Sequence, residues 1–235
     1  MKPVKYFMYL WMTAFAILLF AGSAKADLYW ETSSVSVGIP GQSNGNSTQR
    51  YYSSPFALRA ELGAGHIVII RYDTMKLYSL DRRKKTYKEV NLAKLSAVPG
   101  LSGHDQKKMA RLMSTMLWTQ ATPTDKIRTI AGYRCREYFV RVVIVNGEYW
   151  VSKDVTGYRQ LKALGDAGQK IAEYNPLFRQ FDIAGLVREL DGFPVRTVNH
   201  VMGGTVTSTL TRIMQTRLSP ALFDVPRNYA IKKRR

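Results

Sequence analysis

The sequence predicts an α+β protein built on one antiparallel sheet, and three observations support this prediction. Short runs rich in Val, Ile, Thr and aromatic residues follow one another along most of the chain, separated by Gly, Pro, Asn and Ser. Two apolar stretches with helical period interrupt them. Strands and helices do not alternate as in a parallel sheet, and most connections are short enough for hairpins, which join antiparallel strands.

The N-terminal 26 residues have the pattern of a secretory signal peptide. Two lysines precede an uncharged run at 6–22, and Ala24 and Ala26 have the spacing that a signal peptidase recognises. We therefore predict cleavage before Asp27 and a periplasmic location. The alternative is an uncleaved membrane anchor, for which the apolar run is short, because a bilayer span needs about 20 residues.

The mature chain, residues 27–235, has the length of one sizeable domain and is strongly basic. The formal net charge of the whole sequence is +18, and the signal peptide contains lysines but no acidic residue. Because Cys135 is the single cysteine, an intramolecular disulfide is excluded. The hydrophobic core alone must hold the domain together.

The first half of the mature chain is expected to form consecutive strands. A loop rich in Gly, Pro, Asn and Ser separates the first two, and "HIVIIRYD" is apolar on both faces, which is typical of a central strand. "DRRKK" predicts a hairpin tip between the last two. The expected strands cover residues 27–37, 48–54, 56–63, 66–73, 76–81 and 85–90.

A helix is then expected from Gly103, capped by Ser102, because apolar residues recur at helical spacing up to Leu117. Further strands are expected, and "NGE" at 146–148 predicts a tight hairpin turn, since Asn-Gly adopts positive φ readily. A second helical zone covers 158–191, and the tail from 219 is expected to be irregular and basic. The expected strands of this half cover 126–133, 136–145, 148–154, 193–202 and 205–216.

Cys135, flanked by Arg134 and Arg136, is the strongest candidate for a nucleophile, because nearby positive charge favours the thiolate. In an extended strand, however, both arginines point away from the face of the cysteine. We therefore predict a structural cysteine. Tyr138 and Val140 share the parity of the arginines, so either a bulge near Glu137 shifts the phase or the strand is covered on both faces.

Other catalytic or metal-binding patterns are missing from the sequence. His66, His104 and His200 lie in separate elements without a ligand spacing, so we expect no metal. Ser102 in "PGLSGH" lacks the final glycine of a nucleophile elbow, and no phosphate-binding glycine loop occurs. The sequence therefore predicts a protein that is not an enzyme and needs no cofactor.

Four sequence patterns occur in a characteristic order after the signal peptide: "MKLYSLDRRKKTYKEV", "TIAGYRCREYFV", "EYWVSKD" and "LFDVPRNY". Together they resemble an uncharacterised family of secreted bacterial proteins, a domain of unknown function, that is similar in fold to the periplasmic lipoprotein carriers LolA and LolB. The resemblance covers most of 27–231. It implies a curved antiparallel sheet, a half-barrel, with helices packed on its concave face. In the carriers, the space between sheet and helices receives acyl chains, and no catalytic residue is implied.

The leading hypothesis is a periplasmic binding protein for a hydrophobic or lipid-like ligand, or for the acyl chain of a lipoprotein. Its pocket would lie between sheet and helices, although the methionine stripe also suits simple core packing. The expected pocket residues are Met109, Leu112, Met113, Met116, Phe178 and Phe181.

The alternative hypothesis is a basic envelope-associated scaffold that binds anionic surfaces without an apolar pocket. Solvated loops and a frayed tail would explain the same charges without any binding. Nucleic acid is not expected as a partner, because the chain is exported and carries no recognised binding motif. The candidate residues are Arg82, Arg83, Lys84, Lys85, Lys232, Lys233, Arg234 and Arg235.

Overall fold

The structure is a computed structural model that describes residues 27–41, 43–93, 119–142, 145–160, 162 and 189–232. These residues form a twelve-stranded sheet with short helical pieces. The elements are β1 (Asp27–Val37), β2 (Gly45–Ser54), β3 (Ala57–Glu61), β4 (His66–Arg71), β5 (Lys76–Asp81), β6 (Thr86–Asn91), β7 (Thr119–Ile130), β8 (Tyr133–Val142), β9 (Val145–Ser152), β10 (Phe193–Val201), β11 (Gly204–Thr216), the 3₁₀ helix η1 (Pro220–Phe223) and β12 (Ala230–Ile231).

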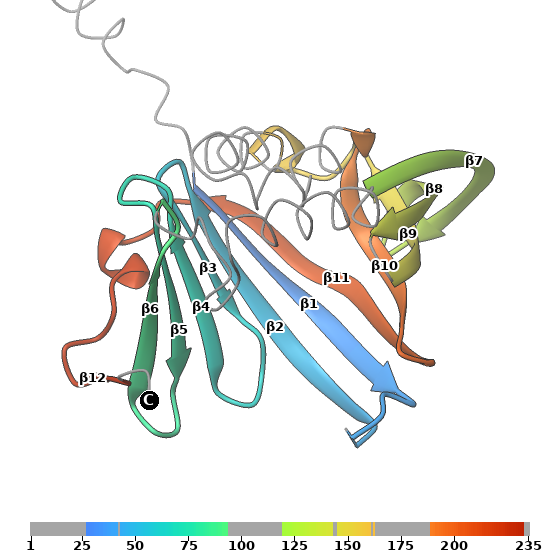
Figure 1. Ribbon diagram of the computed structural model, residues 1–235. Helices are drawn as coiled ribbons and strands as arrows, with labels where there is room; N and C mark the ends of the chain where they lie inside the picture. The colour runs from blue at the N-terminus through green and yellow to red at the C-terminus, as the bar shows by residue number, and fades with distance from the viewer. Residues whose placement is uncertain are drawn as a thin grey trace, which may run out of the picture.

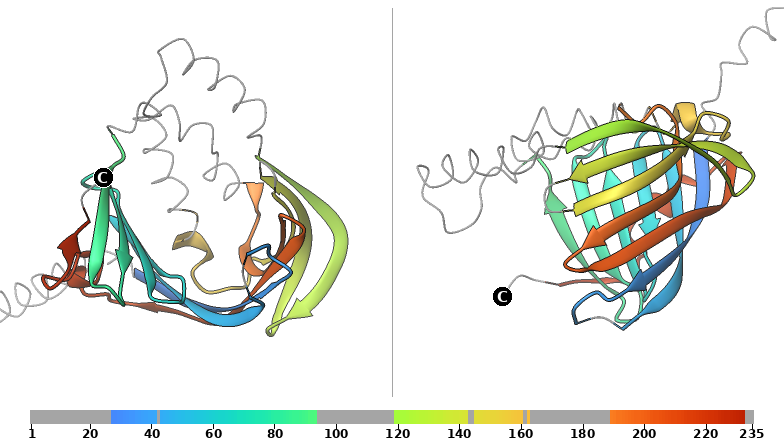
Figure 2. Two further views of the ribbon diagram at one scale, coloured as in Figure 1. Left: turned by 60° about the horizontal axis from the view of Figure 1, so that its bottom comes forward. Right: turned by 90° about the vertical axis from the view of Figure 1, so that its right-hand side faces the viewer.

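Two antiparallel meanders, β1 to β6 and β7 to β11, make up the sheet. The pairing of β1 with β11 joins them, which gives the order β12-β6-β5-β4-β3-β2-β1-β11-β10-β9-β8-β7. Among the described strands, β12 is the one that pairs in parallel, with β6. The sheet is open and strongly curved into a half-barrel (Figures 1 and 2). The predicted curved antiparallel sheet is confirmed.

Two-residue turns connect β7 to β8 and β10 to β11. Ala131 and Gly132 have φ angles of 49° and 83°, and Met202 and Gly203 have φ angles of 49° and 84°. Positive φ at both central residues matches the twist of the strands that such a turn connects. Each turn therefore fixes the register of its hairpin.

The predicted turn at 146–148 is wrong. Asn146 and Gly147 lie inside β9, and the pair of Val142 and Val145 closes the β8–β9 hairpin. A Cβ at Gly147 would lie 2.7 Å from the carbonyl oxygen of Val198 on β10. The glycine thus allows a close approach of two strands, which a local sequence pattern does not distinguish from a turn.

An aromatic and aliphatic cluster packs on the inner side of the sheet. Trp30 stacks on Tyr51 with ring centroids 4.8 Å apart and meets Phe193 edge-on at 5.9 Å. The chain after β9 turns into this cluster, and its helical turn at 158–160, drawn in gold, lies inside the curve in Figure 2. The buried members are Leu28, Trp30, Cys135, Trp150, Val155, Phe193, Val195 and Leu210.

A second cluster covers the outer face of the first meander. Phe223 of η1 is 1% exposed and packs against Ala57, Ile67, Ile69 and Leu80. Because successive residues of a strand point to opposite faces, β4 contributes to both sides of the sheet. Its Val68 and Ile70 face inward, in agreement with the predicted central strand.

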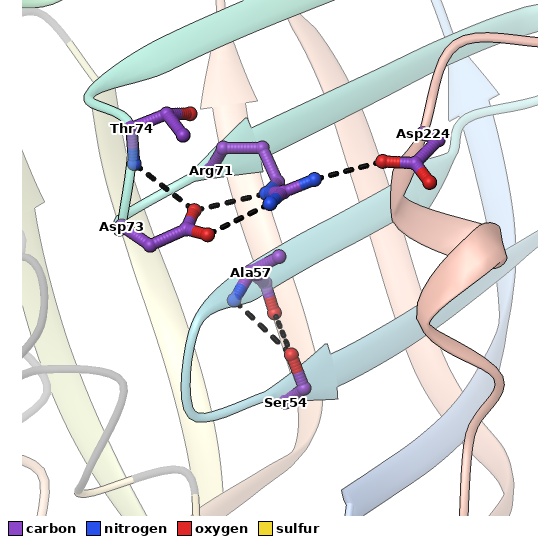
Figure 3. Close-up of polar contacts among 6 residues, drawn as sticks. All are labelled: Ser54, Ala57, Arg71, Asp73, Thr74 and Asp224. Atoms are coloured by element: carbon purple, nitrogen blue, oxygen red, sulfur yellow. Dashed lines mark hydrogen bonds and ion pairs between the residues drawn. The ribbon is translucent and has the colours of Figure 1, made fainter.

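The C-terminal segment is not the irregular tail that the sequence predicted. It forms η1 on the outer face and then β12 beside β6. Arg59 Nη1 donates a hydrogen bond to Leu222 O at 3.0 Å, and Arg71 Nη1 lies 2.8 Å from Asp224 Oδ1 (Figure 3). Side chains distant in the sequence therefore hold the segment in place, a feature that local propensity does not reveal.

The phase problem around Glu137 is resolved by burial on both faces of β8. Cys135 packs in the inner cluster, whereas Tyr138 and Val140 pack with Leu190 on the opposite face. The pairing of β8 with β9 is regular through Glu137. The irregularity lies in the partner strand β7, whose register against β8 shifts between Pro123 and Ile127.

The helices expected on the concave face are not part of the described structure. The segment 103–117 and most of 158–191 lie outside the described residues, as does the expected signal peptide. Of the second zone, the helical turn at 158–160 is described, and its Tyr158 packs against the inner cluster. The described architecture is a curved sheet with very little helix.

Candidate functional site

The pocket residues predicted from the sequence lie outside the described residues. This concerns Met109, Leu112, Met113, Met116, Phe178 and Phe181. Their role as pocket walls stays a prediction. The described part of the chain offers three other features on which a function can be built: the inner face of the sheet, the exposed basic turn and the surroundings of Cys135.

The inner face of the first meander carries a row of side chains that crosses six strands and is apolar except at Ser53. Directly paired residues form the row, so their side chains stand next to one another on one face. Ile70, Leu77 and Val90 are half-buried and belong to none of the three core clusters of the described residues. The full row is Leu28, Ser53, Leu58, Ile70, Leu77 and Val90.

A second inner row lies beside the first and becomes polar toward the sheet edge. Trp30, Tyr51, Ala60 and Val68 are followed by Ser79 and Lys88 along the same line of pairs. Toward the other end of β1, Ser34 accepts a hydrogen bond from Ser208 at 3.3 Å between the hydroxyl oxygens. The apolar wall is therefore bounded, and it is confined to one end of the inner face.

The structure brings together two predicted basic groups that are far apart in the sequence. Arg82, Arg83, Lys84 and Lys85 form the exposed β5–β6 turn. The N–H of Ala230 donates to Lys85 O at 2.9 Å, and the N–H of Lys232 donates to Tyr87 O at 2.7 Å. Strand β12 thus fixes Lys232 beside the turn. Lys233, Arg234 and Arg235 lie outside the described residues.

The thiol of Cys135 is buried and lies at the edge of a shallow depression of about 330 Å³. Burial raises the pKa of the thiol, which opposes formation of the thiolate. Arg134 and Arg136 are exposed on either side, as strand geometry predicted. The depression is lined by Ile127, Arg134, Cys135, Arg136, Tyr138, Val151, Ser152, Lys153, Asp154 and Asp191.

This depression has none of the arrangement that activates a cysteine. Its lining contains no histidine, and the two described histidines, His66 and His200, are exposed on β4 and β10. Lys153 pairs with Asp191 and holds the pKa of that carboxyl below its usual range. Of the three cations in the lining, Lys153 is thus directed to a carboxylate, and Arg134 and Arg136 are the two that flank the cysteine in an extended strand.

A buried carboxylate, Glu137, is the feature that sequence analysis missed. Its side chain is 5% exposed, and Lys126 Nζ lies 3.1 Å from its Oε2. Thr124 donates a hydrogen bond to the same oxygen at 2.9 Å. Both partners come from the irregular stretch of β7, so Glu137 anchors that edge strand. The signal for this carboxylate in the sequence was the change in the parity of buried side chains between Cys135 and Tyr138.

Metal and membrane features are limited in the described residues. They contain no group of three or more His, Cys, Asp or Glu side chains that could hold a metal ion. In the same part of the chain, no helix is long and apolar enough to cross a bilayer.

Comparisons with known proteins give a family match and distant structural similarities. The family model described as domain of unknown function DUF4412 matches residues 42–229. A search of curated proteins finds no match. The structure of PNGF-II in space group C2 is 11% identical, with a TM-score of 0.40. The match covers 88% of this chain and 31% of that chain, so this chain spans about a third of the length of PNGF-II.

Two further similar structures carry LolA-type descriptions. The LolA superfamily protein NE2245 from Nitrosomonas europaea is 7% identical with a TM-score of 0.34, over 86% of this chain and 91% of that chain. A putative outer membrane lipoprotein-sorting protein domain from Vibrio parahaemolyticus is 11% identical with a TM-score of 0.34, over 85% of this chain and 89% of that chain.

Proposed function

The chain belongs to the DUF4412 family of domains of unknown function, and we propose that it is a non-enzymatic protein of the periplasm that holds an acyl chain or a similar apolar ligand against the inner face of its sheet. The observation that carries the proposal is the cross-strand row that includes Leu58, Ile70, Leu77 and Val90. Apolar side chains placed side by side on a concave face offer the extended contact that a hydrocarbon chain requires.

Three further observations support this function. The protonated, buried thiol of Cys135 gives the protein no nucleophile at its only cysteine. The pattern of residues 1–26 is that of a secretory signal. Asp27, the residue after the expected cleavage site, pairs with Thr216 of β11, and its Oδ2 accepts a hydrogen bond from the N–H of Leu218 at 2.8 Å. A mature chain that begins there keeps all of β1.

Binding of a fluorescent fatty acid by the protein purified from periplasm tests the proposal. Ile70→Asn and Leu77→Asn each place an amide in the row, and we expect binding to weaken by roughly 5- to 150-fold, because an unpaired amide against hydrocarbon costs about 1–3 kcal/mol. Val35→Asn is the matched control, since Val35 is 41% exposed outside this row. Circular dichroism establishes that the variants fold.

Two results would contradict the proposal. One is the absence of probe binding by the intact protein, together with the absence of lipid in native mass spectra of the protein from its own periplasm. The other is an equal loss of affinity in the control variant. The alternative scaffold function uses the basic turn and not the inner face, so a protein that binds anionic vesicles but no acyl probe would support that alternative instead.

A further inference from the structure

Four chain connections lie together at one end of the half-barrel, along the lower edge of Figure 1. They join β1 to β2, β3 to β4, β5 to β6 and β10 to β11. We call this end the lower rim and define it by residues 38–41, 43–44, 62–65, 82–85 and 202–203. In a meander, every second turn lies at the same end, so the rim follows directly from the topology.

The lower rim contains no acidic residue in these connections. Two acids adjoin these connections. Asp81, the last residue of β5, accepts hydrogen bonds at its Oδ1 from the N–H groups of Arg83 and Lys84 at 3.0 Å each. Glu61, the last residue of β3, pairs with Arg59 at 2.7 Å. The connections at the other end of the strands contain Asp73, Asp154 and Asp191. In the described residues, the connections at this end therefore carry cations without acids, whereas those at the other end carry both, for example Lys153 beside Asp154.

Exposed apolar side chains occur in the rim, at Met202 and Leu62, and directly beside it, at Val37, the last residue of β1. Met202 is 70% exposed, Val37 is 50% exposed and Leu62 is 41% exposed. Met202 occupies a turn position with a φ of 49°, which favours Asn or Gly. The fold thus places a long apolar side chain outward at a position where a small polar residue would be more stable.

The basic part of the rim is built from two segments. The turn at 82–85 is exposed throughout, and the β12–β6 pairing holds Lys232 close to it. Arg83 also packs its side chain on Gly65 of the β3–β4 turn, where a Cβ would lie 3.1 Å from Arg83 Cγ. The backbone that carries these cations is therefore fixed along the rim.

We propose that the lower rim docks on a lipid surface with anionic headgroups. The cations Arg82, Arg83, Lys84, Lys85 and Lys232 would contact the phosphates, which attract clustered Lys and Arg. Met202, Val37 and Leu62 would enter the boundary between headgroups and acyl chains. The complementarity between the cations of the rim and anionic headgroups favours a lipid surface as the partner. Apolar side chains at separate connections also suit a fluid headgroup layer better than a rigid protein surface. This inference does not depend on ligand binding at the inner face.

Sedimentation with vesicles tests the inference. We expect the full mature chain to bind vesicles of phosphatidylcholine mixed with phosphatidylglycerol, to bind phosphatidylcholine alone far more weakly, and to lose binding as salt rises. Replacing Arg82, Arg83, Lys84 and Lys85 by Gln is expected to weaken binding by at least about 100-fold at low salt, since each cation near the surface contributes roughly a factor of five.

The matched charge control replaces Arg134, Arg136, Arg196 and Arg217 by Gln, which removes the same charge from exposed positions away from the rim. Retained binding in this control supports the inference, and an equal loss in both variants overturns it, because net charge alone would then account for binding. Absence of binding by the intact protein also overturns it.

The apolar part of the rim is tested by Met202→Asn, which suits the turn geometry and should leave the fold intact. Weaker vesicle binding at high salt supports insertion of Met202, whereas unchanged binding at all salt concentrations overturns the apolar contribution. Acyl-probe binding, measured in parallel, should be unaffected by the rim variants. Loss of the probe with retained vesicle binding would contradict only the proposed ligand function.

Discussion

Arg71 of β4 and Asp224, which follows η1, are joined by an ion pair across 153 positions of the sequence, with Nη1 2.8 Å from Oδ1. The same guanidinium binds Asp73 through Nε and Nη2, at 2.9 Å and 2.7 Å, so Asp73 orients it toward the C-terminal segment (Figure 3). Its Cζ also lies 5.4 Å from the ring centre of Phe56. Arg71 thereby fastens the C-terminal segment to the outer face.

The adjacent Phe223 should matter far more for stability than this ion pair. Phe223→Ala removes the ring that fills the outer cluster, and we expect the free energy of unfolding to fall by about 3–5 kcal/mol. Asp224→Asn should lower it by less than about 1 kcal/mol, because Asp224 is exposed to solvent. Urea denaturation of both variants checks this, and equal effects would show that the segment is held mainly by charge.

Acid should weaken the fold partly through Asp73. Hydrogen bonds from Arg71 hold the pKa of this carboxyl below its usual range. A lowered pKa in the folded state stabilises the protein above the unfolded pKa of about 3.9, and the contribution is lost as pH falls through the folded pKa. We expect Asp73→Asn to be less stable than wild type near neutral pH, with the difference shrinking below about pH 4.

Thermal denaturation across pH measures this difference. Asp125→Asn, at an exposed position of β7, removes one carboxyl without changing the contact of Arg71 and serves as the control. A constant difference between Asp73→Asn and wild type down to strongly acidic pH would exclude Asp73 as the titrating group.

Cys135 should be unreactive in the folded protein. Its side chain is fully buried, its Sγ contacts Tyr133 O at 3.4 Å, and burial raises its pKa. Alkylation by iodoacetamide at neutral pH should therefore be far slower than in urea, where the thiol is exposed. Rapid labelling of the native protein would contradict the structural role of this cysteine. Mass spectrometry at timed intervals provides the measurement.

Glu137 should stabilise the edge of the second meander. Glu137→Ala removes the acceptor of Thr124 and the partner of Lys126, and we expect the free energy of unfolding to fall by about 1.5–3 kcal/mol, as for a hydrogen bond to a charged group. Lys126→Met should cost less than about 1 kcal/mol, because Lys126 is 66% exposed. Amide hydrogen exchange in β7 should be faster in Glu137→Ala than in Lys126→Met. Unchanged exchange in Glu137→Ala would exclude the anchoring role.

The candidate sites were predictable to different degrees. The turn at 82–85 was identified correctly, because a run of cations between two strand patterns is a local signal. The position of Lys232 close to this turn could not be predicted, because β12 has only two residues and pairs with β6 through backbone hydrogen bonds. The apolar row on the inner face also escaped detection, since its members belong to six strands whose register no local pattern contains.

Local physics in the sequence determined the strands, most of the hairpins, the burial of Cys135 and the antiparallel nature of the sheet. These features depend on side-chain alternation and turn residues within a few positions of one another. Tertiary structure alone decided that β1 pairs with β11, that Gly147 lies inside β9 close to β10 rather than in a turn, and that Arg71 holds Asp224. Such contacts arise from strand curvature and register, which set distances between residues that the sequence keeps far apart.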